Sequence, residues 1–403
     1  MEQTPLIGLD RIEAAQRVLR GVARCTPLEG SRVLSALVGG PVSFKCENLQ
    51  RTGSFKIRGA YTRIARLGAA ERSRGVVAAS AGNHAQGVAL AAALHDAAAT
   101  VYMPAGVPLP KVEATAGYGA RVEFVGETID EALQAARQHA DRDGSVFIHP
   151  FDHPDVMAGQ GTVGLEIVQQ CPDVATVVVP LGGGGLVSGV AAAVKALRAD
   201  VRVVGVQAAG AAAWPASLRA GQPVGLTESQ TIADGIAVGM PGQYTFQHVR
   251  ALVDEVRTVS EESLSQALLL CLERAKLVVE PAGAAAVAAV SDEPGAFRPP
   301  VVVVLSGGNL DPLLLGKVID HGLAAAGRFP SLTVRMPDRP GSLVRLLEVL
   351  ATTGANVLDV EHHRTGGELA LQDVDVAVQL ETRGPEHSGR VRTALRQAGY
   401  GVS

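Results

Sequence analysis

The chain has 403 residues, of which 47% are hydrophobic and only 3% aromatic, and its formal net charge at pH 7 is −4. Because no run of Lys or Arg forms a basic stripe, we expect no nucleic-acid partner. The Val- and Ala-rich runs are interrupted by Gly, Pro or charged residues well before they reach membrane-spanning length, so we expect no membrane association.

The cysteines and the N-terminus predict a cytoplasmic protein. Cys25, Cys46, Cys171 and Cys271 have neither the paired spacing of a metal site nor the density of a disulfide framework. Reduced structural thiols are typical of the cytosol. No basic segment followed by an apolar core opens the chain, so no signal peptide is expected.

The first predicted elements lead to a lysine segment. A helix is expected over Asp10–Val22, with Asp10 as its N-cap, and a strand over Val42–Cys46. Residues 52–60 then read Thr-Gly-Ser-Phe-Lys-Ile-Arg-Gly-Ala. Apolar residues recur at helical spacing from Ile57 onward, and Ser54 or a neighbour is the expected cap of that helix.

From residue 76 onward, strands and helices alternate in two series, which predicts βαβ units and parallel sheets. The first series has strands at Val76–Ala79, Thr100–Met103, Arg121–Val125 and Val146–Ile148, with helices at Gln86–Leu94, Lys111–Tyr118 and Asp130–His139. The second has helices at Val156–Gln169, Ser188–Leu197, Glu261–Arg274 and Ala282–Val290, and strands at Thr176–Val179, Arg202–Val206 and Val301–Leu305. Residues 210–231 are expected to be irregular. We predict an α/β catalytic domain over 1–326 with two parallel-sheet lobes, the smaller within about residues 45–150.

The composition changes after Gly327, and a second domain is predicted over 327–403. Its elements are a strand at Ser331–Met336, a helix from the Asp338–Leu343 segment to about Thr353, strands at Asn356–His363 and Leu371–Leu380 joined by a turn at Thr365–Gly367, a helix at Pro385–Ala398 and a short last strand from Tyr400. This βαββαβ order is ferredoxin-like.

Three polar or glycine-rich stretches directly follow predicted buried strands. They are Ser80-Ala81-Gly82-Asn83-His84, Gly182-Gly183-Gly184-Gly185-Leu186 and Ser306-Gly307-Gly308-Asn309. In open α/β sheets ligands bind at the carboxyl ends of the strands, so these stretches are expected to share one site.

Lys56 is the expected centre of that site. It lies in the first turn of its helix, where the positive end of the dipole and partial burial both disfavour the ammonium form. The free amine can then form a Schiff base. An isolated lysine at a helix start is more often solvated, and only the other three stretches favour the chemical role.

These motifs together make the sequence recognisable. With Lys45–Gln50, Gly159–Thr162 and Glu280–Ala284, they closely resemble the threonine dehydratase (threonine ammonia-lyase) family of fold type II, tryptophan synthase β-like, pyridoxal 5′-phosphate (PLP) enzymes. The segment Asp338-Arg339-Pro340-Gly341 and its surrounding elements resemble an ACT domain, a module that often senses amino acids.

The resemblance implies a role for each motif residue. Lys56 would carry PLP as a Schiff base and remove the substrate α-proton, and Phe55 would pack against the ring. Asn83 would bind the ring hydroxyl, Gly182, Gly183, Gly184, Gly185 and Leu186 the phosphate, and Ser306 the ring nitrogen. Ser80, Ala81, Gly82, Asn83 and His84 would surround the substrate carboxylate, although His84 can equally be a satisfied core histidine.

Two further positions are expected near the cofactor, and Ser306 bears on the reaction type. A serine hydroxyl at the ring nitrogen can donate a hydrogen bond but cannot hold the nitrogen protonated as a carboxylate would, so Ser306 favours β-elimination over transamination. Glu280 is expected near the cofactor or, alternatively, as an ordinary carboxylate at a helix start.

No metal site is expected. Related serine racemases bind a divalent ion through two carboxylates and a carbonyl, but the matching positions here are Gln207, Ala211 and Ala213.

The resemblance implies deamination of L-threonine to 2-oxobutanoate, the first step of isoleucine biosynthesis, with L-serine as a secondary substrate. It also implies feedback by isoleucine, with valine as its antagonist, in a homotetramer. A serine dehydratase or racemase, a β-replacement enzyme and a non-catalytic ACT-type amino-acid sensor are the alternatives left open.

Overall fold

The computed structural model describes residues 5–364, 370 and 372–403. It divides into two compact units that meet in the sequence between Pro312 and Leu313. The domain boundary expected after residue 326 stays a prediction.

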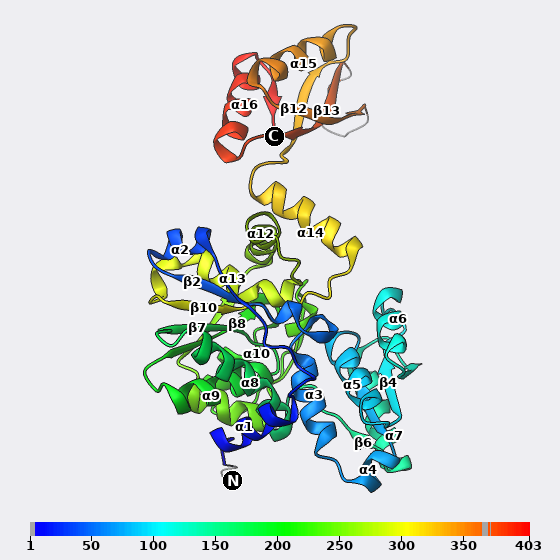
Figure 1. Cartoon of the computed structure of the whole chain (residues 1–403). Coiled ribbons are helices and arrows are strands. Elements are labelled where there is room, and N and C mark those ends of the chain that lie inside the picture. Colours follow the sequence, from blue (N-terminus) through cyan, green and yellow to red (C-terminus); the bar gives the residue numbers. More distant parts are fainter. Residues whose placement is uncertain (1–4, 365–369, 371) are drawn as a thin grey trace. The chain divides into compact units, whose positions relative to one another are not determined.

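The first unit contains two sheets (Figure 1). In the larger, of order β1-β2-β10-β7-β8-β9, β1 is antiparallel to β2 and all other neighbours are parallel. The smaller sheet, β5-β4-β3-β6, is parallel throughout. The strands are β1 (Leu28–Gly30), β2 (Val42–Lys45), β3 (Val76–Ala79), β4 (Ala99–Met103), β5 (Arg121–Phe124), β6 (Val146–Phe147), β7 (Thr176–Pro180), β8 (Arg202–Ala208), β9 (Glu255–Val259) and β10 (Val301–Val304). The predicted two-lobed α/β fold with parallel sheets is confirmed.

Helices connect these strands and cover both sheets (Figure 1). They are α1 (Leu9–Val18), α2 (Arg32–Val38), α3 (Lys56–Ala65), α4 (Ala69–Ser73), α5 (Asn83–Ala93), α6 (Leu109–Gly117), α7 (Ile129–Asp143), α8 (Pro154–Gln170), α9 (Gly185–Leu197), α10 (Ala213–Ala220), α11 (Gln243–Leu252), α12 (Glu261–Leu270) and α13 (Pro281–Asp292). Short helical turns lie at Glu47–Leu49, Arg51–Gly53 and Asp234–Ile236. Within the described part of the chain, no helix has the length and apolar character needed to cross a membrane.

The alternation of strand side chains places the lysine helix at the junction of the two lobes. Val76 and Ala78 belong to the core shared with α3 and α5, whereas Val77 and Ala79 pack with Ala132 of α7 on the opposite face of the smaller sheet. Helix α3 packs against α5 on one side and against α8, of the larger lobe, on the other (Figure 1).

The predicted N-cap at Asp10 was wrong, and the N-cap of α3 is Phe55, a neighbour of Ser54, without a side-chain hydrogen bond. Ser54 is extended, with a buried hydroxyl that has no hydrogen-bond partner, and α3 is instead preceded by Phe55 in helical geometry. Asp10 lies inside the first turn of α1, whose N-cap is Gly8.

The stretch expected to be irregular contains a helix. Residues 213–220 form α10, with Pro215 in its third position. Proline is tolerated there because N–H groups of the first helical turn have no partner within the helix. Helix α11 and strand β9 were also missed by the sequence analysis.

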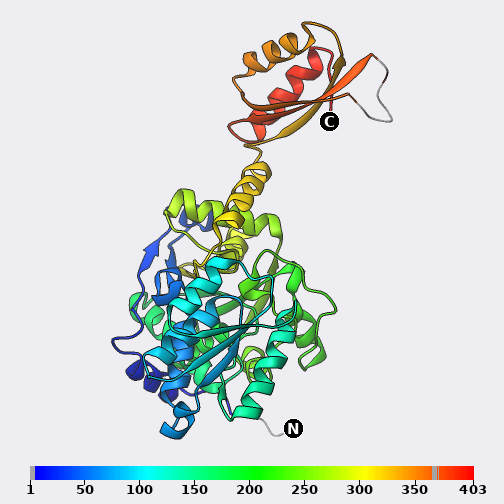
Figure 2. The ribbon, with the colours of Figure 1, turned by 90° about the vertical axis from the view of Figure 1, so that its right-hand side faces the viewer.

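The second unit is a four-stranded antiparallel sheet of order β12-β13-β11-β14, preceded by a helix. Helices α15 and α16 cover one face of this sheet, where Val334, Val376, Leu346 and Leu395 are fully buried together (Figure 2). The elements are α14 (Pro312–Ala325), β11 (Ser331–Pro337), α15 (Ser342–Thr353), β12 (Asn356–His363), β13 (Asp373–Glu381), α16 (Pro385–Gln397) and β14 (Gly401–Val402). The ferredoxin-like order and the pairing of β12 with β13 are confirmed; the predicted turn at Thr365–Gly367 lies outside the described residues.

Candidate active site

The lysine segment and the serine loop lie side by side, although they are far apart in the sequence. Ser54 forms an isolated antiparallel bridge with Gly307. The N–H of Phe55 donates to the carbonyl oxygen of Ser306 at 3.2 Å, and the N–H of Gly308 donates to that of Gly53 at 2.9 Å. These backbone contacts hold the start of α3 against the end of β10, where Ser306 is only 3% exposed.

Lys56 is the first residue of α3, as the sequence predicts. Its Nζ donates to the carbonyl oxygen of Pro150 at 2.9 Å and lies 5.2 Å from the centre of the Phe55 ring. Burial lowers the pKa of Lys56 to about 8, against the opposing effect of the Glu280 carboxylate. About one tenth of the amine is therefore unprotonated at pH 7, far more than for an ordinary lysine.

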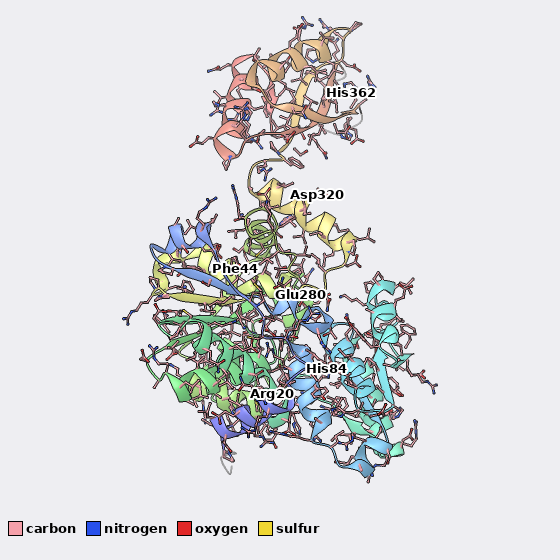
Figure 3. The ribbon with its side chains drawn as sticks, in the orientation of Figure 1. Arg20, Phe44, His84, Glu280, Asp320 and His362 are labelled. Carbon is pink, nitrogen blue, oxygen red and sulfur yellow. The ribbon has the colours of Figure 1, made fainter. Side chains whose placement is uncertain are left out.

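Asn83 is held from both ends of its amide. Its Nδ2 donates to Oε1 of Glu280 at 2.6 Å, and its Oδ1 accepts from Nδ2 of Asn309 at 2.7 Å. Glu280 directly precedes α13 (Figure 3), and burial raises the pKa of its carboxyl to about 7. The stretches at residues 80–84 and 306–309 thus join, with Glu280, in one hydrogen-bond network.

The loop at residues 80–84 forms the turn from β3 into α5. The N–H of Gly82 donates to Oγ of Ser80 at 3.2 Å, Ala81 lies between them, and α5 begins at Asn83. His84 is buried in α5 (Figure 3), with its Nε2 2.8 Å from the carbonyl oxygen of Ile148. Burial lowers the pKa of His84 to about 3. Its ring makes the contact of a core histidine, so the ring is engaged away from the turn.

The glycine loop joins β7 to α9. Gly184 has φ +100°, which favours glycine, and a Cβ added at Gly183 would lie 2.5 Å from the Phe151 ring. The carbonyl oxygens of the loop are engaged by side chains, since Gly182 O accepts from Trp214 Nε1 and Gly183 O from Thr245 Oγ1, both at 2.7 Å. Leu186 is buried in the core of the larger lobe, so it can contribute to a ligand only through its backbone.

Residues 148–152 contact three of these motifs, and the sequence analysis assigned them no part in the site. Ile148 O contacts His84, Pro150 O accepts from Lys56, Phe151 packs on Gly183, and Asp152 accepts from the N–H groups of Gln243 and Thr245 at 2.9 and 3.0 Å. The segment follows strand β6, so the rule that ligand sites lie at strand ends could have identified it.

A buried network of ion pairs joins the lysine helix α3 to neighbouring elements. Arg58 pairs with Glu47 and with Glu166, each at 2.7 Å, and Lys45 pairs with Glu166 at 2.5 Å. Although burial acts to raise it, the Arg58 guanidinium holds the pKa of Glu47 below its usual value. The network fixes α3 to α8 and to the segment that follows β2.

At the positions matched to the metal ligands of related racemases, the side-chain amide of Gln207 makes the local hydrogen bonds. Gln207 is fully buried, its Nε2 donates to Ala211 O at 3.1 Å, and its Oε1 accepts from the N–H of Trp214 at 3.0 Å. Ala213 begins α10. Across residues 5–364, 370 and 372–403, no group of three or more His, Cys, Asp or Glu side chains is placed to hold a metal ion. The absence of a metal stays a prediction.

The arrangement fits PLP. The cofactor needs an amine for its aldehyde and hydrogen-bond donors for its phosphate. Lys56 supplies the amine, and the glycine loop, which packs against the Phe151 ring too closely for a side chain at Gly183, supplies N–H groups.

Comparisons with known proteins agree with this geometry. Residues 19–307 match the family model of pyridoxal-phosphate dependent enzymes, and residues 331–399 match that of the ACT domain. An L-threonine ammonia-lyase of Thermotoga maritima is 47% identical over 397 residues, which cover 98% of this chain and 99% of that protein.

Two solved structures resemble the larger part of the chain. A threonine deaminase from T.th. is 41% identical with a TM-score of 0.72, and the match covers 76% of this chain and 99% of that one. A maize serine racemase is 36% identical with a TM-score of 0.74, and the match covers 79% of this chain and 99% of that one.

Proposed function

This chain belongs to the family of pyridoxal-phosphate dependent enzymes and carries an ACT domain, and we propose that it is an ammonia-lyase that converts L-threonine to 2-oxobutanoate and ammonia. One observation carries the proposal: two consecutive residues contact the lysine amine and the glycine loop. Lys56 Nζ lies 2.9 Å from Pro150 O, and Phe151 packs against the glycine loop. The choice of threonine rests on the relative in Thermotoga maritima that matches nearly the whole chain.

Each motif has one task in holding the cofactor. Lys56 would hold PLP covalently, the N–H groups of the glycine loop would bind its phosphate, Asn83 would bind its ring hydroxyl and Ser306 its ring nitrogen. When bound, PLP supplies an electron sink for negative charge at the substrate Cα. Phe55 would pack against its ring.

The protein residues would then bind the substrate and move its proton. N–H groups at the turn of residues 80–84, where α5 begins, would bind the substrate carboxylate as the start of a helix does. The Lys56 amine, whose pKa burial lowers to about 8, would take the proton from Cα. Ser306, as a neutral donor, favours departure of the β-hydroxyl over transamination.

Steady-state formation of keto acid from L-threonine and from L-serine tests this proposal. We expect L-threonine to be preferred, because an apolar pocket discriminates one methyl group by roughly 10- to 200-fold. Formation of no keto acid from either substrate would contradict it.

The likeness to a serine racemase supports a second candidate, racemisation or β-replacement at the same site. Chiral analysis of serine after incubation identifies racemisation. Added sulfide identifies replacement, because a second nucleophile is then consumed.

The second unit is proposed to bind an amino-acid effector, isoleucine as inhibitor and valine as its antagonist. A cavity of about 350 Å³ lies at the start of α15, lined by apolar Met336, Leu343 and Val344 and by charged Asp338, Arg339 and Arg364. This lining suits a zwitterion with an aliphatic side chain. A homotetramer in the cytoplasm and a place at the first step of isoleucine biosynthesis complete the proposal.

A further inference from the structure

The two carbonyl groups at the head of the glycine loop are both held by buried side chains. Trp214 Nε1 donates to Gly182 O at 2.7 Å. Thr245 Oγ1 lies 2.7 Å from Gly183 O and 3.2 Å from Gly242 O, so its single hydroxyl proton takes the shorter contact. Trp214 and Thr245 are each 0% exposed.

These contacts decide where the N–H groups of the loop point. In a trans peptide the C=O of one residue and the N–H of the next point in opposite directions. With the carbonyl groups of Gly182 and Gly183 turned toward Trp214 and Thr245, the N–H groups of Gly183 and Gly184 face the other side. Gly185 and Leu186 add N–H groups from the first turn of α9, which have no partner within the helix.

The N–H groups of this face are available to a ligand. In the described part of the chain, the N–H groups of residues 183–186 make no hydrogen bond to another protein group. Four donors on one side of a turn form a site for an anion with three oxygens.

The two side chains are themselves fixed from outside the loop. The N–H of Trp214 donates to Oε1 of Gln207 at 3.0 Å, and the N–H of Thr245 donates to Oδ1 of Asp152 at 3.0 Å. A Cβ added at Gly184 would lie 2.7 Å from the Trp214 ring and 2.8 Å from Cβ of Thr245, so both pack directly beneath the loop.

We propose that Thr245 and Trp214 are positioning residues that hold the carbonyl groups of the glycine loop away from the cofactor and so aim its N–H groups at the phosphate. This inference rests on the proposed function, in which the loop binds the phosphate of PLP. Glycine peptides rotate easily, and a rotated peptide would present a carbonyl oxygen to the phosphate. The loss of either donor should therefore weaken binding of the phosphate and leave binding of the ring and aldehyde unchanged.

Affinity for PLP and for pyridoxal, which lacks the phosphate, separates these effects. Cofactor-free full-length protein is titrated with each compound and followed by visible absorption. The variants are Thr245→Val, which removes the hydroxyl at nearly constant volume, Thr245→Ser, which restores it, and Trp214→Phe, which removes Nε1–H and keeps a ring. Thr115→Val is the matched control, since Thr115 is another fully buried threonine whose Oγ1 donates to a carbonyl group, that of Lys111 at 3.0 Å.

For Thr245→Val and Trp214→Phe we expect the Kd of PLP to rise on the order of tenfold, the cost of leaving one buried acceptor unpaired. The Kd of pyridoxal should stay within about twofold of the wild type, and Thr245→Ser and Thr115→Val should leave both constants near the wild type.

Three results would overturn the inference. An unchanged Kd of PLP in both Thr245→Val and Trp214→Phe would show that the donors do not position the loop. Equal weakening of PLP and pyridoxal would show that they act on the fold as a whole. A wild-type protein that binds PLP no more tightly than pyridoxal would show that the glycine loop does not bind the phosphate, and would contradict this part of the proposed function as well. If Thr245→Val does not fold, Trp214→Phe decides alone.

Discussion

Asn83 donates a hydrogen bond of 2.6 Å from Nδ2 to Oε1 of Glu280, a carboxyl whose pKa burial raises to about 7. The side chain proposed to bind the ring hydroxyl is therefore tied to a group that changes charge near neutral pH. Asn309 holds the other end of the same amide. A change of charge on Glu280 must act on Asn83 directly.

This carboxyl should make the stability of the cofactor-free protein depend on pH. Its pKa is about 7 in the folded chain against an ordinary value of 4.5, so the folded state binds more protons between these values and stability falls as pH rises. We expect Glu280→Gln to abolish a loss of roughly 2 kcal/mol between about pH 5 and pH 8. Trp214 is the only tryptophan and lies in the first unit, so its fluorescence in denaturant titrations follows that unit.

Exposed Glu262 provides the control, because Glu262→Gln should leave the pH dependence of the wild type intact. A Glu280→Gln variant that loses as much stability with rising pH as the wild type would show that Glu280 is ionised throughout this range.

Lys56→Ala should abolish turnover and the visible absorption of bound cofactor while leaving the fold intact, because Lys56 serves as covalent anchor and as base. Lys56→Arg keeps the positive charge but cannot form the Schiff base, so it should be equally inactive. Visible spectra, keto-acid assays and Trp214 fluorescence separate loss of chemistry from loss of structure. Turnover near that of the wild type in either variant would refute the assignment.

Ser306→Asp should slow dehydration by about tenfold or more and increase side reactions, because a buried carboxylate would hold the ring nitrogen protonated. Ser306 is 3% exposed, so water cannot screen the new charge effectively. Ser306→Ala, which removes the donor without adding charge, is the control. The ratio of keto acid to transamination product is the measurement, and an unchanged ratio in Ser306→Asp would show that this position does not govern the ring.

The sequence predicted the parts of the site that carry local signatures. Strand β3 at Val76–Ala79 and strand β12 at Asn356–His363 were predicted to the residue, because a short β-branched or alternating run bounded by turn residues is a local pattern. Lys56 and the glycine loop were identified for the same reason. Trp214, Thr245 and Arg58 were missed because their contacts join residues tens of positions apart, and no local pattern marks a tryptophan that lies beneath a glycine loop.

Arg58 illustrates the energetic weight of such long-range contacts. Arg58→Leu should destabilise the first unit by about 3–5 kcal/mol, because it removes the ion-pair partner of the buried Glu47 and leaves Glu166 with Lys45 alone. Denaturant unfolding followed by Trp214 fluorescence measures the change, with exposed Arg17→Leu as the control. A loss below about 1 kcal/mol would place the pair in the range of surface salt bridges and contradict the role given to the network.

The last prediction concerns control by the second unit. Isoleucine should shift the threonine saturation curve of the full chain to higher concentration and should leave a chain that ends at Ala326 unaffected. The cavity of about 350 Å³ at the start of α15 offers backbone N–H groups near Gly341 for a carboxylate and Leu343 and Val344 for an aliphatic side chain. In the proposed homotetramer, ligand bound there would act on Lys56 by favouring one arrangement of the subunits, through a coupling of roughly 1–3 kcal/mol.

Two alanine substitutions, one of a valine and one of a leucine, separate ligand binding from assembly in that experiment. Val344→Ala reduces the apolar lining of the cavity and should weaken the response to isoleucine, whereas Leu358→Ala, on strand β12 and outside the lining, should preserve it. Size-exclusion chromatography with light scattering reports whether each variant, and the shortened chain, keeps the oligomeric state of the full chain. A response to isoleucine that survives in the shortened chain, or that is absent from the full one, would show that the ACT domain serves assembly alone, because a coupling between two sites must disappear when one of them is removed.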